Sequence, residues 1–147
     1  MITFRKVTKS NYEDIIKLDA GEEGHKHVAK NYYTLLQAFF EYDINGVNGI
    51  YYNNIPVGLF FYYRFNNTIW ISRFMIDEKY QNKGIGKKAF SKLVNLIISK
   101  ENPEKIEYLT SNPIMFSIYP GFKKVKTQRS KNYYNKYKEH LMVLQLK

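Results

Sequence analysis

The chain has 147 residues, of which 44% are hydrophobic, and its formal net charge at pH 7 is +10. This composition excludes an intrinsically disordered chain, and the length suits one domain with its own core. The chain contains no cysteine, which excludes disulfides, thiol catalysis and cysteine-ligated metal sites. The positive charge favours anionic partners, among them nucleic acids and cofactors that carry several phosphates.

The three histidines, His25, His27 and His140, lack the HExxH spacing of a zinc site, so we expect no metal. The N-terminal segment lacks the apolar run of a signal peptide. No stretch approaches the roughly 18 apolar residues that a membrane span needs. We therefore expect a soluble, cytoplasmic protein that does not enter the membrane and forms a single domain over residues 1–147.

The N-terminal third of the chain predicts one strand and two helices. Residues 2–7 alternate as a strand does, and the capping-box pattern at residues 10–13 predicts a helix that continues to about residue 18. A polar turn follows. From Asn31 apolar residues recur at helical spacing, which predicts a second helix. Its buried face is expected to consist of Tyr32, Leu35, Leu36, Phe39 and Phe40.

Three consecutive strands are predicted in the middle of the chain. Residues 49–52 and 57–63 are rich in aromatic and β-branched side chains, and the turn at residues 53–54 joins them into a hairpin. A second turn at residues 66–67 leads into a strand over residues 68–76. Because the connections are short, we expect these strands to be antiparallel neighbours.

The C-terminal half predicts a long helix, a strand, a short helix and two closing strands. The long helix carries a core-facing stripe, Ile85, Ala89, Phe90, Leu93, Val94 and Ile97. A strand follows over residues 105–109, and Pro113 suits the first position of a short helix. Closing strands are expected over residues 122–127 and 141–146. The order β-α-α-β-β-β-α-β-α-β-β indicates an α/β fold with a mixed, mostly antiparallel sheet flanked by helices.

Two glycines stand where the long helix begins, in the segment Gln81-Asn-Lys-Gly84-Ile-Gly86. A helix N-terminus exposes unpaired backbone N–H groups, and glycines let an anion approach them closely. A dinucleotide fingerprint would place a third glycine at Ala89, and a P-loop would place Ser or Thr at Lys88. The segment therefore indicates a pyrophosphate cradle, with a simple structural turn as the alternative.

The residues around these glycines carry a family resemblance. The stretch RFMIDEKYQNKGIGKKAFSKLV resembles the acetyl-CoA motif of the GNAT N-acetyltransferases, Gln/Arg-x-x-Gly-x-Gly/Ala, and the predicted element order resembles the GNAT fold. The stretches HVAKNYYTLLQAFFE, IPVGLFFYY and WISRFMIDEKYQNKGIGKKAF are similar to bacterial polyamine acetyltransferases. The resemblance implies transfer of an acetyl group from acetyl-CoA, as co-substrate, to a primary amine by direct attack in a ternary complex.

The resemblance also implies which residues bind the donor. The backbone of the strand before the cradle would pair with the pantetheine arm, at Phe74, Met75 and Ile76. The pyrophosphate would lie on Gln81, Asn82, Lys83, Gly84, Ile85 and Gly86, with Lys87 at the edge. Asn112 keeps its place in a second family motif, Asn-x-x-Ala-x-x-Leu-Tyr-x-x-x-Gly-Phe.

The catalytic groups depart from the family pattern. Tyr119 matches the tyrosine that protonates the leaving thiolate, but only Pro120 separates it from Gly121, where the family has three residues. Polyamine-acetylating relatives tend to carry a carboxylate on the fourth strand, and Ser72 stands there, which is a poor base. We expect Tyr119 as the acid, with a water relay or a carboxylate from elsewhere as the base.

The acceptor is expected near the connection of the first two helices. Glu22, Glu23 and Ser72 are the predicted substrate-binding residues, and His25 and His27 are candidate proton relays; a solvated loop is the alternative. The net charge disfavours a polycation as acceptor. Because GNAT relatives are often dimers, the resemblance also implies a homodimer.

Other acceptors and one other class stay open. The amine could belong to a protein, an aminoglycoside or an amino acid. The segment 123–138 has no acidic residue, which fits a solvated hairpin, attraction of CoA phosphates, or a basic nucleic-acid-binding module, although no aromatic RNA-binding motif appears. An inactive CoA-binding module is the remaining alternative.

Overall fold

The computed structural model describes residues 1–147 and contains one sheet of seven strands, in the order β1-β2-β3-β4-β5-β7-β6. Only β4 and β5 run parallel; all other neighbours are antiparallel. The predicted mixed, mostly antiparallel sheet is confirmed. The strands are β1 (Ile2–Lys6), β2 (Val47–Tyr52), β3 (Ile55–Phe65), β4 (Thr68–Ile76), β5 (Lys105–Thr110), β6 (Lys123–Lys124) and β7 (His140–Gln145).

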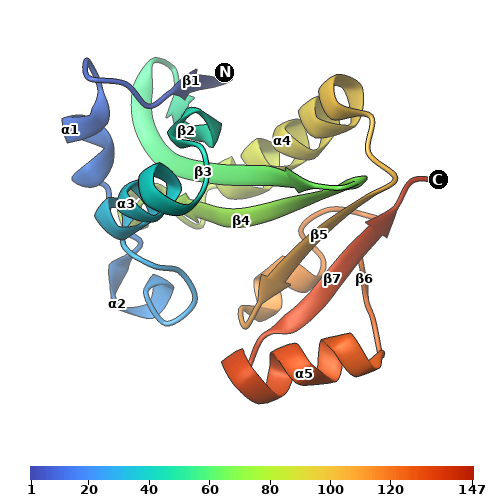
Figure 1. Cartoon of the computed structure of the whole chain (residues 1–147). Helices are drawn as coiled ribbons and strands as arrows, with labels where there is room; N and C mark the ends of the chain where they lie inside the picture. The colour runs from blue at the N-terminus through green and yellow to red at the C-terminus, as the bar shows by residue number, and fades with distance from the viewer.

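Helices cover both faces of the sheet (Figure 1). The α-helices are α1 (Tyr12–Ile16), α2 (Gly21–Gly24), α3 (Asn31–Glu41), α4 (Ile85–Glu101) and α5 (Gln128–Tyr137). Three short 3-10 helices are η1 (Ile44–Gly46), η2 (Glu78–Tyr80) and η3 (Pro113–Phe116). None of these helices combines the length and the apolar character that crossing a bilayer requires.

Helix α4 supplies the larger core. All six residues of the predicted stripe are buried, and they pack against the sheet in a cluster of 19 buried residues. The helix ends at Glu101, and the next residue, Asn102, caps it in the left-handed conformation just before Pro103. Their burial confirms the predicted core-facing stripe, which the sequence indicated clearly because the stripe is long and its period is helical.

Helix α3 buries the face opposite to the one predicted. Most of its large apolar side chains lie in solvent, with Phe39 64% and Phe40 76% exposed, whereas Asn31, Thr34 and Ala38 are buried. Of the predicted face only Leu35 is partly buried, against the smaller core cluster. The Asn31 side chain donates a hydrogen bond to the carbonyl of Ile15 in α1, at 2.9 Å. The hydrogen bond of Asn31 and the small side chain of Ala38 therefore determine which face of α3 is buried, and the periodicity of its apolar residues does not.

The C-terminal segment also differs from the prediction. The expected strand over residues 122–127 shortens to Lys123–Lys124, and residues 128–137 form α5 instead of part of a hairpin. A reciprocal capping box starts α5: Thr127 Oγ1 accepts from the Ser130 N–H at 3.1 Å, and Ser130 Oγ accepts from the Thr127 N–H at 2.8 Å. Because Ser replaces the usual Glu or Gln of that pattern, the sequence signal is weak.

The first helix region is likewise more broken than predicted. Helix α1 begins after Asn11 and ends at Ile16, and the expected turn over residues 19–27 contains α2. Asn11 uses its side-chain oxygen to accept from the Thr8 N–H at 2.8 Å, outside the helix. The predicted Ser10 capping box therefore does not form.

Candidate active site

The two central strands separate where the site lies. β4 pairs with β5 only from Thr68 to Trp70, and beyond Trp70 the strands diverge, which Figure 1 shows between the green β4 and the brown β5. The remainder of β4 stays paired with β3 alone, so Phe74, Met75 and Ile76 form a free strand edge. Such an edge presents unpaired backbone groups that an extended ligand can bind.

A β-bulge marks the start of this free edge. In the β3–β4 pair Tyr62 lies opposite Ile71 and Phe61 opposite Arg73, so Ser72 is the extra residue. Bulges redirect side chains and are frequent beside active sites. The Arg73 guanidinium donates to the Ser72 carbonyl at 2.9 Å and to Gln37 of α3 at 2.8 Å. The bulge is thus fixed by a contact with α3.

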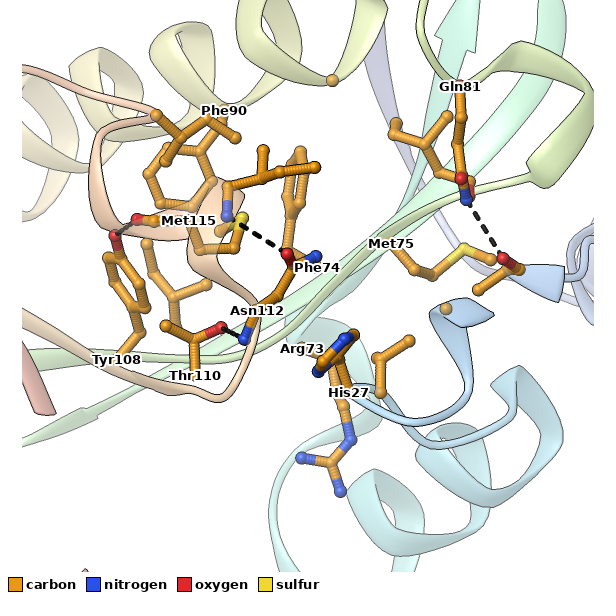
Figure 2. A pocket seen from close by; sticks show the side chains of 18 of the residues that line it. His27, Arg73, Phe74, Met75, Gln81, Phe90, Tyr108, Thr110, Asn112 and Met115 are labelled. Atoms are coloured by element: carbon orange, nitrogen blue, oxygen red, sulfur yellow. Dashed lines mark hydrogen bonds between the residues drawn. The ribbon is translucent and has the colours of Figure 1, made fainter. Parts of the chain in front are cut away.

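A cavity of about 970 Å³ occupies the space between the diverging strands. In Figure 2 Tyr108, Thr110 and Asn112 lie on one side of β4, and Gln81 lies beyond Met75 at its far end. The structure brings most predicted site residues to this cavity: Glu23, Ser72, Phe74, Met75, Ile76, Gln81, Asn82, Gly84, Gly86, Lys87 and Asn112. The predicted residues outside its lining are Glu22, Lys83, Ile85 and Tyr119.

The N-terminus of α4 opens onto the cavity. Gly84 is left-handed, with φ of 81°, and a Cβ built there meets nothing within 4 Å. No side chain caps this helix, and Lys88 N–H bonds back to the Gly84 carbonyl at 3.2 Å. The amides of Ile85, Gly86 and Lys87 therefore have no helical partner and point outward with the positive end of the helix dipole. This arrangement fits an anionic group such as a pyrophosphate.

Two predicted cradle residues contribute no side chain to the cavity. Ile85 is 6% exposed and belongs to the core cluster under α4. The Lys83 ammonium lies 5.9 Å from the centre of the Tyr80 ring. Ile85 can therefore offer an anion only its backbone amide, whereas the exposed Lys83 side chain lies by Tyr80 and outside the cavity lining.

Gln81 and Asn112 hold the backbone around the cavity. Gln81 Nε2 donates to the Ile76 carbonyl at 2.8 Å and to the Ala20 carbonyl at 3.1 Å, which joins the end of β4 to the start of α2. Asn112 Oδ1 accepts from the Ile114 N–H at 3.1 Å and starts η3. Both side chains position loops that line the cavity.

Tyr119 lies outside the lining of the cavity. Its hydroxyl donates to Asn95 Oδ1 of α4 at 2.9 Å, and its ring packs edge-on against Phe122. Counted back from Gly121 with the family spacing, the tyrosine position falls on Ser117, which does line the cavity. Counted forward from Asn112, the same motif gives Tyr119, so the two-residue deletion makes the two ends of the motif disagree on this position.

Helix α2 and the connection from α2 to α3 form another wall of the cavity. Glu23 is 84% exposed and pairs with Lys26 at 2.8 Å, a hydrogen bond that lowers the pKa of its carboxyl. His27 Nδ1 lies 2.6 Å from Ser111 Oγ, so this connection touches the end of β5 across the cavity. No three histidine, aspartate or glutamate side chains converge as a metal site would require.

His25 is held within the same wall. Its Nε2 lies 2.8 Å from Asp19 Oδ1, and its Nδ1 lies 3.3 Å from the Val28 carbonyl. A hydrogen bond from the Gly21 N–H, followed by the one from His25, lowers the pKa of the Asp19 carboxyl. His25 therefore stabilises this connection, with both ring nitrogens engaged.

Glu139 is a cavity residue that the sequence reasoning missed. It is half-buried, lies directly before β7, and has no hydrogen bond or ion pair. Burial raises the pKa of its carboxyl, and the nearby Arg73 opposes that shift. The available signal was its isolation, because Glu139 is the only acidic residue after Glu107 and directly follows the basic segment.

Comparisons with known proteins agree with this geometry. The family model for the acetyltransferase (GNAT) family matches residues 12–119. A spermine/spermidine N(1)-acetyltransferase of Bacillus subtilis is 41% identical over 54 residues, which is 31% of this chain and 36% of the relative. The match thus spans about a third of the length of that curated relative.

Solved structures share the fold. The PaiA N-acetyltransferase of Thermoplasma acidophilum, in complex with coenzyme A, superposes with a TM-score of 0.69 at 16% identity and 99% coverage of both chains. A GNAT acetyltransferase of Staphylococcus aureus gives a TM-score of 0.69 at 20% identity over the whole of both chains. The splayed β4–β5 pair, the open start of α4 and the matching family model together show that the chain belongs to the GNAT family of acetyltransferases.

Proposed function

We propose that the protein transfers an acetyl group from acetyl-CoA to a primary amine, by direct attack in a ternary complex. The observation that carries this proposal is the free edge of β4 beside the uncapped N-terminus of α4, both on one cavity. An extended, amide-containing chain that ends in a pyrophosphate matches these two features in order.

The donor site follows from that arrangement. The backbone of Phe74, Met75 and Ile76 would pair with the pantetheine arm, and the amides at the start of α4 would hold the pyrophosphate. Lys87 adds positive potential at the same place, since its side chain is exposed at the cavity edge. Acetyl-CoA supplies an activated acyl thioester, whose carbonyl would lie near the bulge at Ser72.

The acceptor would reach the thioester from the wall formed by Arg73, His27 and Glu23. A polyamine is the first candidate, because a relative named for spermine and spermidine matches part of the chain. Arg73 favours a second candidate, an amino acid whose carboxylate would pair with the guanidinium. Its Nε is buried and has no partner within the protein, which leaves one donor unsatisfied.

The test is release of free thiol from acetyl-CoA in the presence of spermidine, spermine or glutamate. A thiol reagent reports only the product, because the protein itself has no cysteine. Turnover with the polyamines supports the first acceptor, and turnover with glutamate supports the second. Binding of CoA without thiol release above spontaneous hydrolysis for any primary amine would contradict the transferase proposal and favour an inactive CoA-binding module.

A further inference from the structure

We propose that Glu139 receives the acceptor amine and takes its proton, in place of the carboxylate that polyamine-acetylating relatives tend to carry at the position of Ser72. This inference rests on the proposed acetyl transfer. The ammonium gives one proton to the Glu139 carboxylate, and the neutral nitrogen then forms a C–N bond to the acetyl carbon. The C–S bond breaks with its electron pair on sulfur, which takes the second proton from nitrogen, while Glu139 releases the first to solvent.

The cavity offers few other carboxylates that could accept the proton. Of the 29 lining residues only Glu23 and Glu139 carry a carboxylate. Glu23 is exposed and engaged by Lys26, so it is already paired in the free protein. Ser72 is a poor base at neutral pH. Glu139 is therefore the carboxylate that remains free to bind an ammonium.

The fold places Glu139 at the opening between the strands. β7 starts at His140, which lies opposite Thr110, the last residue of β5 in the sheet. Glu139 precedes that pair, on the β5 side of the cavity, at the end where β4 has already diverged. Arg73 of β4 is the cation whose charge acts on it. The acceptor nitrogen would thus lie between β4 on one side and Glu139, at the start of β7, on the other.

The end of α5 fixes this position. Lys138 adopts a left-handed conformation with φ of 58°, and its N–H bonds to the Tyr134 carbonyl at 2.8 Å. This helix cap turns the chain so that the next residue enters β7. The basic segment 123–138 thereby has a structural role, because the end of α5 places Glu139 at the cavity.

The surroundings suit a base. Burial raises the pKa of the Glu139 carboxyl, which strengthens it as a proton acceptor toward a donor with a pKa of about 10. Arg73 on β4 is the cation whose charge acts on Glu139, Lys138 and His140 flank it in the chain, and Lys26, His25 and His27 line the same cavity from the α2–α3 wall. None of them pairs with Glu139 in the free protein.

The test compares Glu139→Gln with wild type over pH 7 to 9.5, using thiol release with spermidine and with propylamine. Removing the base should lower kcat roughly 100-fold at neutral pH. The variant depends on amine that solvent has already deprotonated, so the defect should shrink by about tenfold per pH unit toward the amine pKa. Glu139→Asp should restore part of the rate, and CoA affinity should stay unchanged.

The matched control is Glu13→Gln, an exposed carboxylate on α1 outside the cavity. Wild-type rates for Glu139→Gln, or a defect of equal size at every pH, would overturn the role of Glu139 while leaving acetyl transfer intact. A wild-type protein that releases no thiol with spermidine, propylamine or glutamate would overturn both proposals together.

Discussion

Replacing Gly86 with aspartate separates the stability of the fold from the affinity for the donor. Gly86 is the second residue of α4, its φ is not in the left-handed range, and a Cβ built there meets only Ile76 Cγ1 at 3.5 Å. An acidic side chain at this helix position interacts favourably with the dipole, by about 0.3 to 1 kcal/mol. The free protein should therefore melt about 1 to 4 °C higher.

The same aspartate should oppose CoA binding. At about 5 Å and an effective dielectric constant of about 40, two like charges repel by roughly 1.7 kcal/mol. Two phosphate charges then cost about 3 kcal/mol, which is roughly a 100-fold rise in Kd. Isothermal titration calorimetry measures this change in Kd, and the difference in Kd between the variant and the wild type should become smaller as salt is added, because salt screens the repulsion.

Gly86→Asn is the matched control, because it has nearly the same shape as aspartate without the charge. The Asn variant reports steric exclusion, and the difference between the two variants reports charge alone. Equal losses for Asp and Asn would show that no anion lies at the helix terminus. Unchanged CoA affinity for both variants would refute the cradle itself.

Four further substitutions test other parts of the structure. Tyr119→Phe should change kcat by less than about twofold, because the hydroxyl bonds Asn95 outside the cavity; a 100-fold loss in thiol release would return the acid role to Tyr119. Phe40 is exposed, so Phe40→Ser should change the free energy of unfolding by less than about 0.5 kcal/mol, whereas Ala38→Leu enlarges a buried side chain and should destabilise the protein by about 1 to 3 kcal/mol. Urea unfolding measures both values, and the reverse order would contradict the observed buried face of α3. Arg129→Met removes the partner that lies 2.6 Å from the fully buried Glu107 carboxylate, and should destabilise the protein by about 3 kcal/mol. Lys105 remains 3.0 Å from Glu107, so an unchanged free energy of unfolding would show that Lys105 alone neutralises this buried charge.

The sequence predicted the parts of the fold that depend on local chemistry. The stripe on α4, the turns at residues 53–54 and 66–67, and the glycines at the helix start each have a signal within a few residues. The free amides at the start of α4 are what the GxG pattern indicated, and the left-handed conformation of Gly84 is an addition from the structure. The family resemblance then named the ligand for a geometry that local patterns had already indicated.

The parts that the sequence did not predict depend on contacts between distant segments. The face of α3 is decided by Asn31 bonding to Ile15, which no helical period reveals. The bulge at Ser72 is visible only through the register of β3. Glu139 enters the cavity because α5 ends where it does; its isolation after the basic segment marks the residue in the sequence but does not indicate where the fold places it.

The most direct measurement is the stoichiometry of wild-type turnover with acetyl-CoA and a primary amine. Free thiol and acetylated amine should appear in equal amounts, with the amine product identified by mass spectrometry. That result would establish transfer to the acceptor. Thiol release without acetylated amine, or CoA binding with neither product, would contradict the account.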